Sequence, residues 1–248
     1  MKHLLTLNNV NGGYQRTKPV LHDVSFSVNR SEIVGLIGLN GAGKSTSIKH
    51  ILGLMQPFQG SVEVNGSTIA GDPDAYRRQI AYIPETPLLY EELTLWEHLE
   101  VTAMAYDIKE EVFKERAEAL LKEFRMTRMK HWFPDHFSKG MRQKVMIMSA
   151  FLLEPELYIA DEPFVGLDPV GIKSFLERMQ QMRDKGCGIL MSTHILSTAE
   201  KYCDRFVFLN EGRVLMEGTM KELQEQASMP GADLDDIYVA VTEERRYE

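Results

Sequence analysis

A glycine-rich stretch near residue 40 has the residue types and the spacing needed to bind phosphate. It follows the apolar run Glu32–Ile37 and precedes Ser45–Leu54, a segment patterned as a helix. Its glycines let successive backbone N–H groups face one point without a Cβ in the way, at a helix N-terminus that attracts anions. The G-x-x-x-x-G-K-S pattern in this strand–loop–helix context predicts a nucleotide-binding P-loop, or Walker A motif. The stretch consists of Gly38, Leu39, Asn40, Gly41, Ala42, Gly43, Lys44, Ser45 and Thr46.

Two side chains of this stretch add chemistry that its backbone lacks. Lys44 is expected to reach the β- and γ-phosphates, and Ser45 to offer its hydroxyl to Mg²⁺. The competing interpretation is a glycine turn that only joins a strand to a helix. The complete motif in its required context favours a nucleotide and Mg²⁺ as ligands.

Two adjacent carboxylates, Asp161 and Glu162, end the buried-strand run 157–160 and stand before Pro163. Keeping two carboxylates there is unfavourable unless they bind a metal or perform acid–base chemistry. With a P-loop upstream, Asp161 is the expected Mg²⁺ partner and Glu162 the candidate for polarising the attacking water. The alternative is an acidic pair that merely forms a turn.

Two further polar residues follow predicted strands. Glu85 comes after the strand 80–84, and His194 comes after the strand 188–192 and Thr193. Parallel α/β sheets bind ligands at the carboxyl ends of their strands, so both side chains are candidates for the same site. For Glu85, a solvated loop glutamate is an equally good interpretation. A lone histidine is more often a structural hydrogen-bonding group than a catalytic one.

Tyr14 and Ser138 are two weaker candidates. Tyr14 lies on a glycine-bearing turn ahead of the P-loop, where its ring could stack on adenine, although an exposed or edge-packed tyrosine fits nearly as well. Ser138 stands at the N-cap of a predicted helix that ends near Glu154. Gly140 follows at the helix start, where N–H groups and the helix dipole favour an anion. The alternative is that Ser138 is only an N-cap, which would be sufficient if this segment were considered by itself.

The chain is predicted to form a single domain over residues 1–248. Short alternating segments assign residues 1–30 and 61–84 to an antiparallel β subdomain. Helical spacing of apolar residues assigns 86–155 to an inserted helical subdomain, with Thr94 and Glu97 as a capping box. Residues 219–248 are predicted to form a C-terminal helical extension.

Composition excludes several classes of function. The chain is 44% hydrophobic and 26% charged, as soluble globular proteins are. Its net charge of −8 argues against broad nucleic-acid binding, although local basic patches can exist on a chain of negative total charge. Cys187 and Cys203 have no metal-ligand spacing, which favours thiols in a reducing compartment. The longest apolar run, 145–153, is too short for a membrane span. We therefore expect a cytoplasmic protein that would act on a membrane only through a partner.

The ordered motifs resemble the ATP-binding subunits of ABC transporters over essentially the whole chain. The resemblance implies an α/β fold with a P-loop NTPase core, an N-terminal antiparallel β subdomain and an inserted helical subdomain. It also implies a Mg²⁺-dependent ATPase coupled to transport, working as a homodimer with two ATP molecules between its protomers. The motifs are Tyr14, GLNGAGKST (38–46), FSKGMRQK (137–144), LYIADEP (157–163), GLD (166–168) and His194.

The same resemblance implies a role for each matching residue. ATP would be bound by Tyr14 stacking on adenine and by the P-loop, and from the opposite protomer by Ser138 and Gly140 at the γ-phosphate. Mg²⁺ would be bound by Ser45, Asp161 and Glu85. Glu162 is implied as the catalytic carboxylate, with Lys44 handling phosphate and His194 sensing the γ-phosphate. Asp168 would communicate across the dimer.

Within the family, residues 82–100 and the ending DLDDIYVAVTEE (233–244) resemble the subgroup serving ABC-2-type exporters. The ATPase subunits of Ecs-type transporters are resembled in particular by the stretches HWFP (131–134) and FSKGM (137–141), by MSTHIL (191–196) and by the same ending. The resemblance implies a multi-span permease partner, peripheral attachment at the cytoplasmic face of the membrane, and export linked to peptide or protein secretion. Glu85 and Lys139 replace the glutamine and glycine usual in the family, which bears on details of Mg²⁺ coordination.

Two other functions compete with transport. Some ABC-type ATPases act without a permease on ribosomes, DNA or assembly partners, but they usually carry two nucleotide domains or a coiled-coil insertion. This chain has no repeated P-loop and no sustained heptads. A nucleotide-gated binding module without turnover is the third interpretation. The complete set of Asp161, Glu162 and His194 weighs against it.

Overall fold

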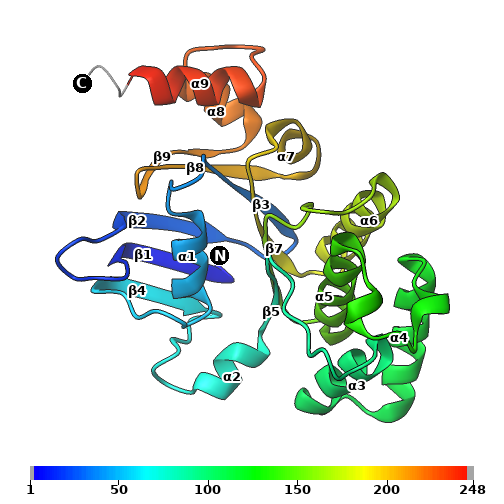
Figure 1. Cartoon of the computed structure of the whole chain (residues 1–248). Coiled ribbons are helices and arrows are strands. Elements are labelled where there is room, and N and C mark those ends of the chain that lie inside the picture. Colours follow the sequence, from blue (N-terminus) through cyan, green and yellow to red (C-terminus); the bar gives the residue numbers. More distant parts are fainter. Residues whose placement is uncertain (1–2, 245–248) are drawn as a thin grey trace.

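The computed structural model describes residues 3–244 and contains two β-sheets with helices packed around them (Figure 1). The larger sheet has the strand order β5-β6-β7-β3-β8-β9, and its strands run parallel except for β9. Every residue of β6 and β7 is buried, as in parallel strands covered on both faces. The predicted α/β fold class is confirmed. The strands are β3 (Glu32–Ile37), β5 (Ile80–Ile83), β6 (Leu157–Asp161), β7 (Gly188–Thr193), β8 (Arg205–Asn210) and β9 (Arg213–Gly218).

The register of the parallel strands brings the predicted site residues to one edge. Ile37, at the end of β3, pairs with Thr193 at the end of β7, and Asp161 on β6 pairs with Ser192. Because these three strands end at the same level, the segments that follow them emerge side by side. The P-loop, the acidic pair and His194 are therefore neighbours.

The smaller sheet is antiparallel, in the order β2-β1-β4, with β1 (Leu5–Gly12), β2 (Leu21–Val28) and β4 (Gln59–Val64). The prediction assigned all of 61–84 to this subdomain, but Ile80–Ile83 is β5 of the larger sheet and pairs in parallel with β6. Three of its four residues are buried, so it has no polar face to turn to water.

A helix that sequence reasoning missed joins the two sheets. α2 (Pro73–Arg78) lies between β4 and β5, and Asp72 caps it by accepting hydrogen bonds from the backbone N–H groups of Asp74 and Ala75. Pro73 at its first position suits a helix start. Its shortness explains why periodicity did not reveal it.

The helical subdomain contains α3 (Leu95–Ala105), α4 (Glu110–Glu123) and α5 (Lys139–Leu153), with two 3₁₀ turns between α4 and α5, η1 (Thr127–Met129) and η2 (Pro134–His136). The predicted capping box of Thr94 and Glu97 is present at the start of α3. Leu99, Leu120 and Phe151, one from each helix, are fully buried and join the helices in a single core.

The remaining helices are α1 (Lys44–Ile51), α6 (Pro169–Asp184), α7 (Leu196–Tyr202), α8 (Met220–Gln226) and α9 (Leu234–Glu244). In Figure 1, α8 and α9 lie over the β8–β9 hairpin, at the opposite end of the molecule from α3. A buried cluster that includes Ile37, Phe208 and Tyr238 holds them there. Residues 245–248 of the predicted C-terminal extension lie outside the described residues.

Candidate functional site

The loop between β3 and α1 has the backbone that a phosphate cradle requires. Gly41 and Gly43 have φ angles of 86° and 108°, in the left-handed region that glycine adopts at little cost. A Cβ on Gly38 would lie 2.4 Å from the carbonyl oxygen of Leu209, so only glycine fits against β8. α1 begins at Lys44, directly after the loop, and its first N–H groups have no partner within the helix. This end of α1 is suited to an anion.

The Lys44 side chain folds back over the loop. It is only 5% exposed, and its Nζ donates to the carbonyl oxygen of Gly38 at 2.6 Å and lies 3.3 Å from Glu162 Oε1. A buried ammonium group without partners would be strongly unfavourable. The carbonyl and the carboxylate therefore fix this positive charge beside the phosphate cradle.

Ser192 organises the acidic pair. Its Oγ donates to Asp161 Oδ1 at 2.5 Å and accepts the backbone N–H of Glu162 at 3.1 Å. Both carboxylates and Ser192 are buried. Sequence reasoning missed Ser192, because a serine inside a buried strand belongs to no motif. The β6–β7 register seen in the structure is what places it beside Asp161.

Glu162 is held in an unusual conformation. Its φ of 45° lies in the left-handed region, which is uncommon for non-glycine residues. Oε2 lies 2.9 Å from His194 Nδ1, whereas the buried Oε1 accepts no hydrogen bond even though Lys44 is near. Oε1 is thus free to accept a hydrogen bond from a group that enters the site.

A cavity of about 430 Å³ brings most of the predicted residues together. Tyr14 is at its rim, 66% exposed, and its hydroxyl accepts a hydrogen bond from Lys49 of α1 at 2.9 Å. That hydrogen bond is the main cause that lowers the pKa of Tyr14. The lining residues are Tyr14, Val20, Leu39, Asn40, Gly41, Gly43, Lys44, Ser45, Thr46, Glu85, Glu162 and His194.

Glu85 lines this cavity from an exposed loop directly after β5. The preceding carbonyl, of Pro84, accepts a hydrogen bond from Nε2 of the buried Gln143 on α5 at 2.9 Å. Burial raises the pKa of Tyr82, and the negative charges of Asp161 and Glu85 add to that effect. Gln143, which was part of a recognised motif but had no predicted role, connects the Glu85 loop to the helical subdomain.

Ser138 and Gly140 do not line the cavity of their own chain. Ser138 caps α5 by accepting the backbone N–H of Met141, as predicted. A Cβ on Gly140 would lie 2.2 Å from the carbonyl oxygen of Gly166, so the start of α5 packs directly on the 166–168 loop.

A second contact joins α5 to this loop. Lys144 Nζ lies 3.1 Å from Oδ2 of Asp168, and the Asp168 side chain also accepts the backbone N–H of Gly171 at 2.5 Å. The Gly171 hydrogen bond and then Lys144 lower the pKa of Asp168, so it is charged at neutral pH. Lys144, one partner in this contact, was part of a recognised motif but had no predicted role.

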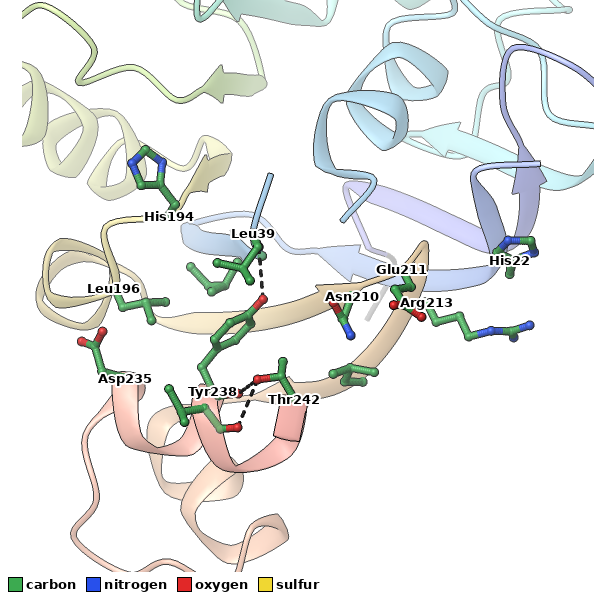
Figure 2. Close-up of a pocket in the computed structure, with 14 residues that line it drawn as sticks. His22, Leu39, His194, Leu196, Asn210, Glu211, Arg213, Asp235, Tyr238 and Thr242 are labelled. Atoms are coloured by element: carbon green, nitrogen blue, oxygen red, sulfur yellow. Dashed lines mark hydrogen bonds between the residues drawn. The ribbon is translucent and has the colours of Figure 1, made fainter. Parts of the chain in front are cut away.

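A larger cleft, about 930 Å³, adjoins the cavity and shares Leu39 and His194 with it (Figure 2). Its other walls come from the β8–β9 hairpin and from α9, including Tyr238 and Thr242. Lys44 and Glu162 line the smaller cavity and not this cleft, so the smaller cavity is the candidate site.

The cradle, the buried lysine and the acidic strand end define a P-loop nucleotide-binding protein. A family model described as ABC transporter matches residues 21–165. The chain belongs to this family, whose ATP-binding subunits are ATPases coupled to transport.

Individual relatives agree with this assignment. The chain is 60% identical to the ABC-type transporter ATP-binding protein EcsA of Bacillus subtilis, over 97% of each chain. It is 34% identical to the SkfA peptide export ATP-binding protein SkfE of the same organism, over 90% of this chain and 92% of the relative. A solved structure described as the ATP binding subunit of an ABC transporter superimposes with a TM-score of 0.94 at 58% identity, covering 96% of this chain and 99% of that one.

Two features are absent from residues 3–244, the part of the chain that the structure describes. None of the helices is long and apolar enough to cross a membrane. No group of three or more His, Cys, Asp or Glu side chains is placed to hold a metal ion. A cation at the acidic pair would therefore need further ligands, such as phosphate oxygens and water, which is how Mg²⁺ is usually bound.

Ser192 is predicted to support catalysis by orienting both carboxylates. Ser192→Ala should lower the kcat for ATP hydrolysis about 10- to 100-fold, as loss of a supporting hydrogen bond commonly does. Ser174→Ala, which removes a hydroxyl bonded to the Glu123 carbonyl on α4, serves as the control and should keep wild-type kcat. Wild-type turnover in Ser192→Ala would show that the acidic pair holds its geometry without the serine.

Proposed function

We propose that this chain is the ATP-hydrolysing motor of an exporter linked to peptide or protein secretion, working as an ATP-sandwich homodimer on a separate permease. It would lie at the cytoplasmic face of the membrane, attached through that permease. The observation that carries the proposal is the single cavity that joins buried Lys44 to the Glu162–His194 pair. Similarity to EcsA, and to SkfE, a peptide export ATP-binding protein, supports the direction of transport.

ATP would bind across this cavity. The exposed ring of Tyr14, held by Lys49, is available to stack on adenine, and the P-loop amides would surround the phosphates. Lys44 would contact the β- and γ-phosphates. The P-loop residues in this role are Gly38, Asn40, Gly41, Ala42, Gly43, Lys44, Ser45 and Thr46.

Mg²⁺ fits the donors that remain at the site. The Ser45 hydroxyl and the carboxylates of Asp161 and Glu85 would hold the ion, and when bound it would neutralise charge on the phosphates. Ser192 bonds one oxygen of Asp161, which fixes the carboxylate without using both of its oxygens. Glu85 would contribute a full negative charge where the wider family has a neutral glutamine.

Glu162 is the proposed general base. Its Oε1, buried and accepting no hydrogen bond, would accept the proton of the attacking water. His194 contacts the other oxygen at 2.9 Å and has a half-exposed side chain, so it would both orient Glu162 and respond to the γ-phosphate. Lys44 Nζ lies 3.3 Å from Glu162 Oε1, so its ammonium group would stand beside both the base and the phosphates.

The second copy would complete the site. Ser138 is exposed and Gly140 partly so, and neither lines the cavity of its own chain. The N-terminus of α5 has donors and a dipole suited to an anion. In a two-fold dimer each α5 start would meet the γ-phosphate on the partner's P-loop, so that ATP binding closes the dimer and hydrolysis opens it.

The permease would dock where the helical subdomain meets the sheet. A groove of about 370 Å³ is lined by the segment that follows α1 and by α2, β5, α3 and α5, including Leu54, Tyr82 and Thr102. Leu54 on its rim is 67% exposed, and Met104 on α3 is 71% exposed. Such a groove fits an amphipathic helix, here a cytoplasmic helix of the permease. Leu88 and Tyr90, which follow β5, are also exposed apolar side chains, whereas Leu89 packs against the helical core.

Glu162→Gln is predicted to stop hydrolysis while preserving ATP binding. The amide keeps the shape but cannot act as a base, so kcat should fall by about 10²- to 10⁴-fold. The Kd for MgATP should stay within about threefold, and an ATP-stabilised dimer should appear on size-exclusion chromatography. The matched control, Glu118→Gln at a surface ion pair, should behave as wild type. Unchanged turnover in Glu162→Gln would put the base elsewhere.

Mixing two inactive variants tests the shared site. Ser138→Arg should block closure through its bulk, and Lys44→Ala should remove phosphate binding. Mixed dimers retain one intact site, so an equal mixture should regain up to about a quarter of wild-type ATPase activity if subunits pair at random. Differently tagged chains would show that mixed dimers form. Mixed dimers without activity would contradict site sharing.

Leu54→Asp is predicted to separate ATPase activity from permease binding. A charge in the apolar groove should prevent co-purification of a multi-span membrane protein with the tagged chain and leave the basal ATPase rate within about twofold of wild type. Val239→Asp, equally apolar-to-acidic but on α9 at the other end of the molecule, should retain the membrane protein (Figure 1). If the tagged wild-type chain also recovers no membrane protein, the proposal of a transport motor fails in favour of a role without a permease.

A further inference from the structure

The C-terminal helix α9 reaches the P-loop through one hydrogen bond. The backbone N–H of Leu39 donates to the hydroxyl of Tyr238 at 3.1 Å, across the larger cleft and between residues 199 positions apart (Figure 2). Within residues 3–244, no other hydrogen bond joins α9 to the stretch 38–46. The hydroxyl is therefore the polar link between the two elements.

Packing fixes the Tyr238 ring that carries this hydroxyl. Tyr238 is 5% exposed, and its ring meets Phe208 of β8 edge-on with centroids 5.2 Å apart. Both belong to a buried cluster with Ile37, the last residue of β3 before the loop. The hydroxyl thus keeps its position relative to the end of β3.

The bonded N–H belongs to the same peptide group that receives the catalytic lysine. Lys44 Nζ donates to the carbonyl of Gly38 at 2.6 Å, and this carbonyl and the Leu39 N–H form one planar unit. Tyr238 binds the N–H edge of this peptide group, and Lys44 binds its carbonyl edge. Because Gly38 has no Cβ to restrict its dihedral angles, the plane would otherwise be easy to rotate.

We infer that Tyr238 is a positioning residue for ATP binding: it orients the Gly38–Leu39 peptide, and through it Lys44 and the mouth of the phosphate cradle. The Leu39 N–H is directed at Tyr238, so the contact does not compete with phosphate. The inference rests on the proposed binding of ATP by the P-loop. It gives the C-terminal segment a direct role in nucleotide affinity.

Tyr238→Phe tests this inference because it removes the hydroxyl and keeps the ring. The Kd for ATP should rise about fivefold, the change that one lost neutral hydrogen bond represents, while kcat at saturating ATP stays within about twofold. Hydrogen–deuterium exchange of a peptide covering 38–43 should be faster in the nucleotide-free variant. A residue that only supported α9 would alter thermal stability without this separation of Kd from kcat.

Two further variants distinguish a failure of the proposed role of Tyr238 from a failure of the proposed nucleotide site. Thr242→Val removes another α9 hydroxyl, which bonds only to the carbonyls of Tyr238 and Val239, and it should match wild type in Kd and in exchange of the loop. An equal rise of Kd in Thr242→Val, or an unchanged Kd in Tyr238→Phe, would overturn the role of Tyr238. Lys44→Ala should lose ATP binding; if it retained wild-type affinity, the proposed nucleotide site itself would be wrong.

Discussion

The burial of a charged lysine beside a charged glutamate is the constraint on which the site depends. Lys44 and Glu162 are both almost fully buried, and charges in that environment persist only when paired and hydrogen-bonded. The pairing requires β3, β6 and β7 to end at one level, which the parallel register provides. The carbonyl of Gly38, the hydroxyl of Ser192 and the ring of His194 then satisfy the remaining polar atoms around the pair, apart from the one glutamate oxygen left open.

The site is also bound to the parts of the chain that would move with it. Gln143 connects α5 to the loop that carries Glu85, and Lys144, the next residue, connects α5 to Asp168. Tyr238 connects the C-terminal helix to the P-loop. The nucleotide cavity therefore contacts the helical subdomain and the C-terminal extension through identifiable single hydrogen bonds.

Sequence alone was sufficient for whatever is encoded locally. The P-loop, the capping box at Thr94 and the N-cap at Ser138 depend on residues a few positions apart, and the strand ends could be located from apolar runs. The partners that order the site are distant in sequence and are common residue types. Ser192 on β7 bonds to Asp161 on the neighbouring strand β6, and Tyr238 bonds to Leu39, which is 199 positions away. The assignment of 80–83 to the wrong sheet has the same origin, since short apolar strands do not specify which sheet they will join. How Ser138 and Gly140 act depends on a second chain, which one sequence does not describe.

The helix α5 has a mechanical consequence. Its N-terminus is capped by Ser138, the residue proposed to face the partner's ATP, and Leu153 at its other end lines the proposed permease groove. Fifteen residues at the usual rise give a stiff strut about 22 Å long, with no proline or glycine after its first turn to act as a joint. A tilt of about 10° around one end would move the other by about 4 Å. A small rotation of α5 at the phosphate end would thus displace its other end, at the groove, by more than the length of a hydrogen bond.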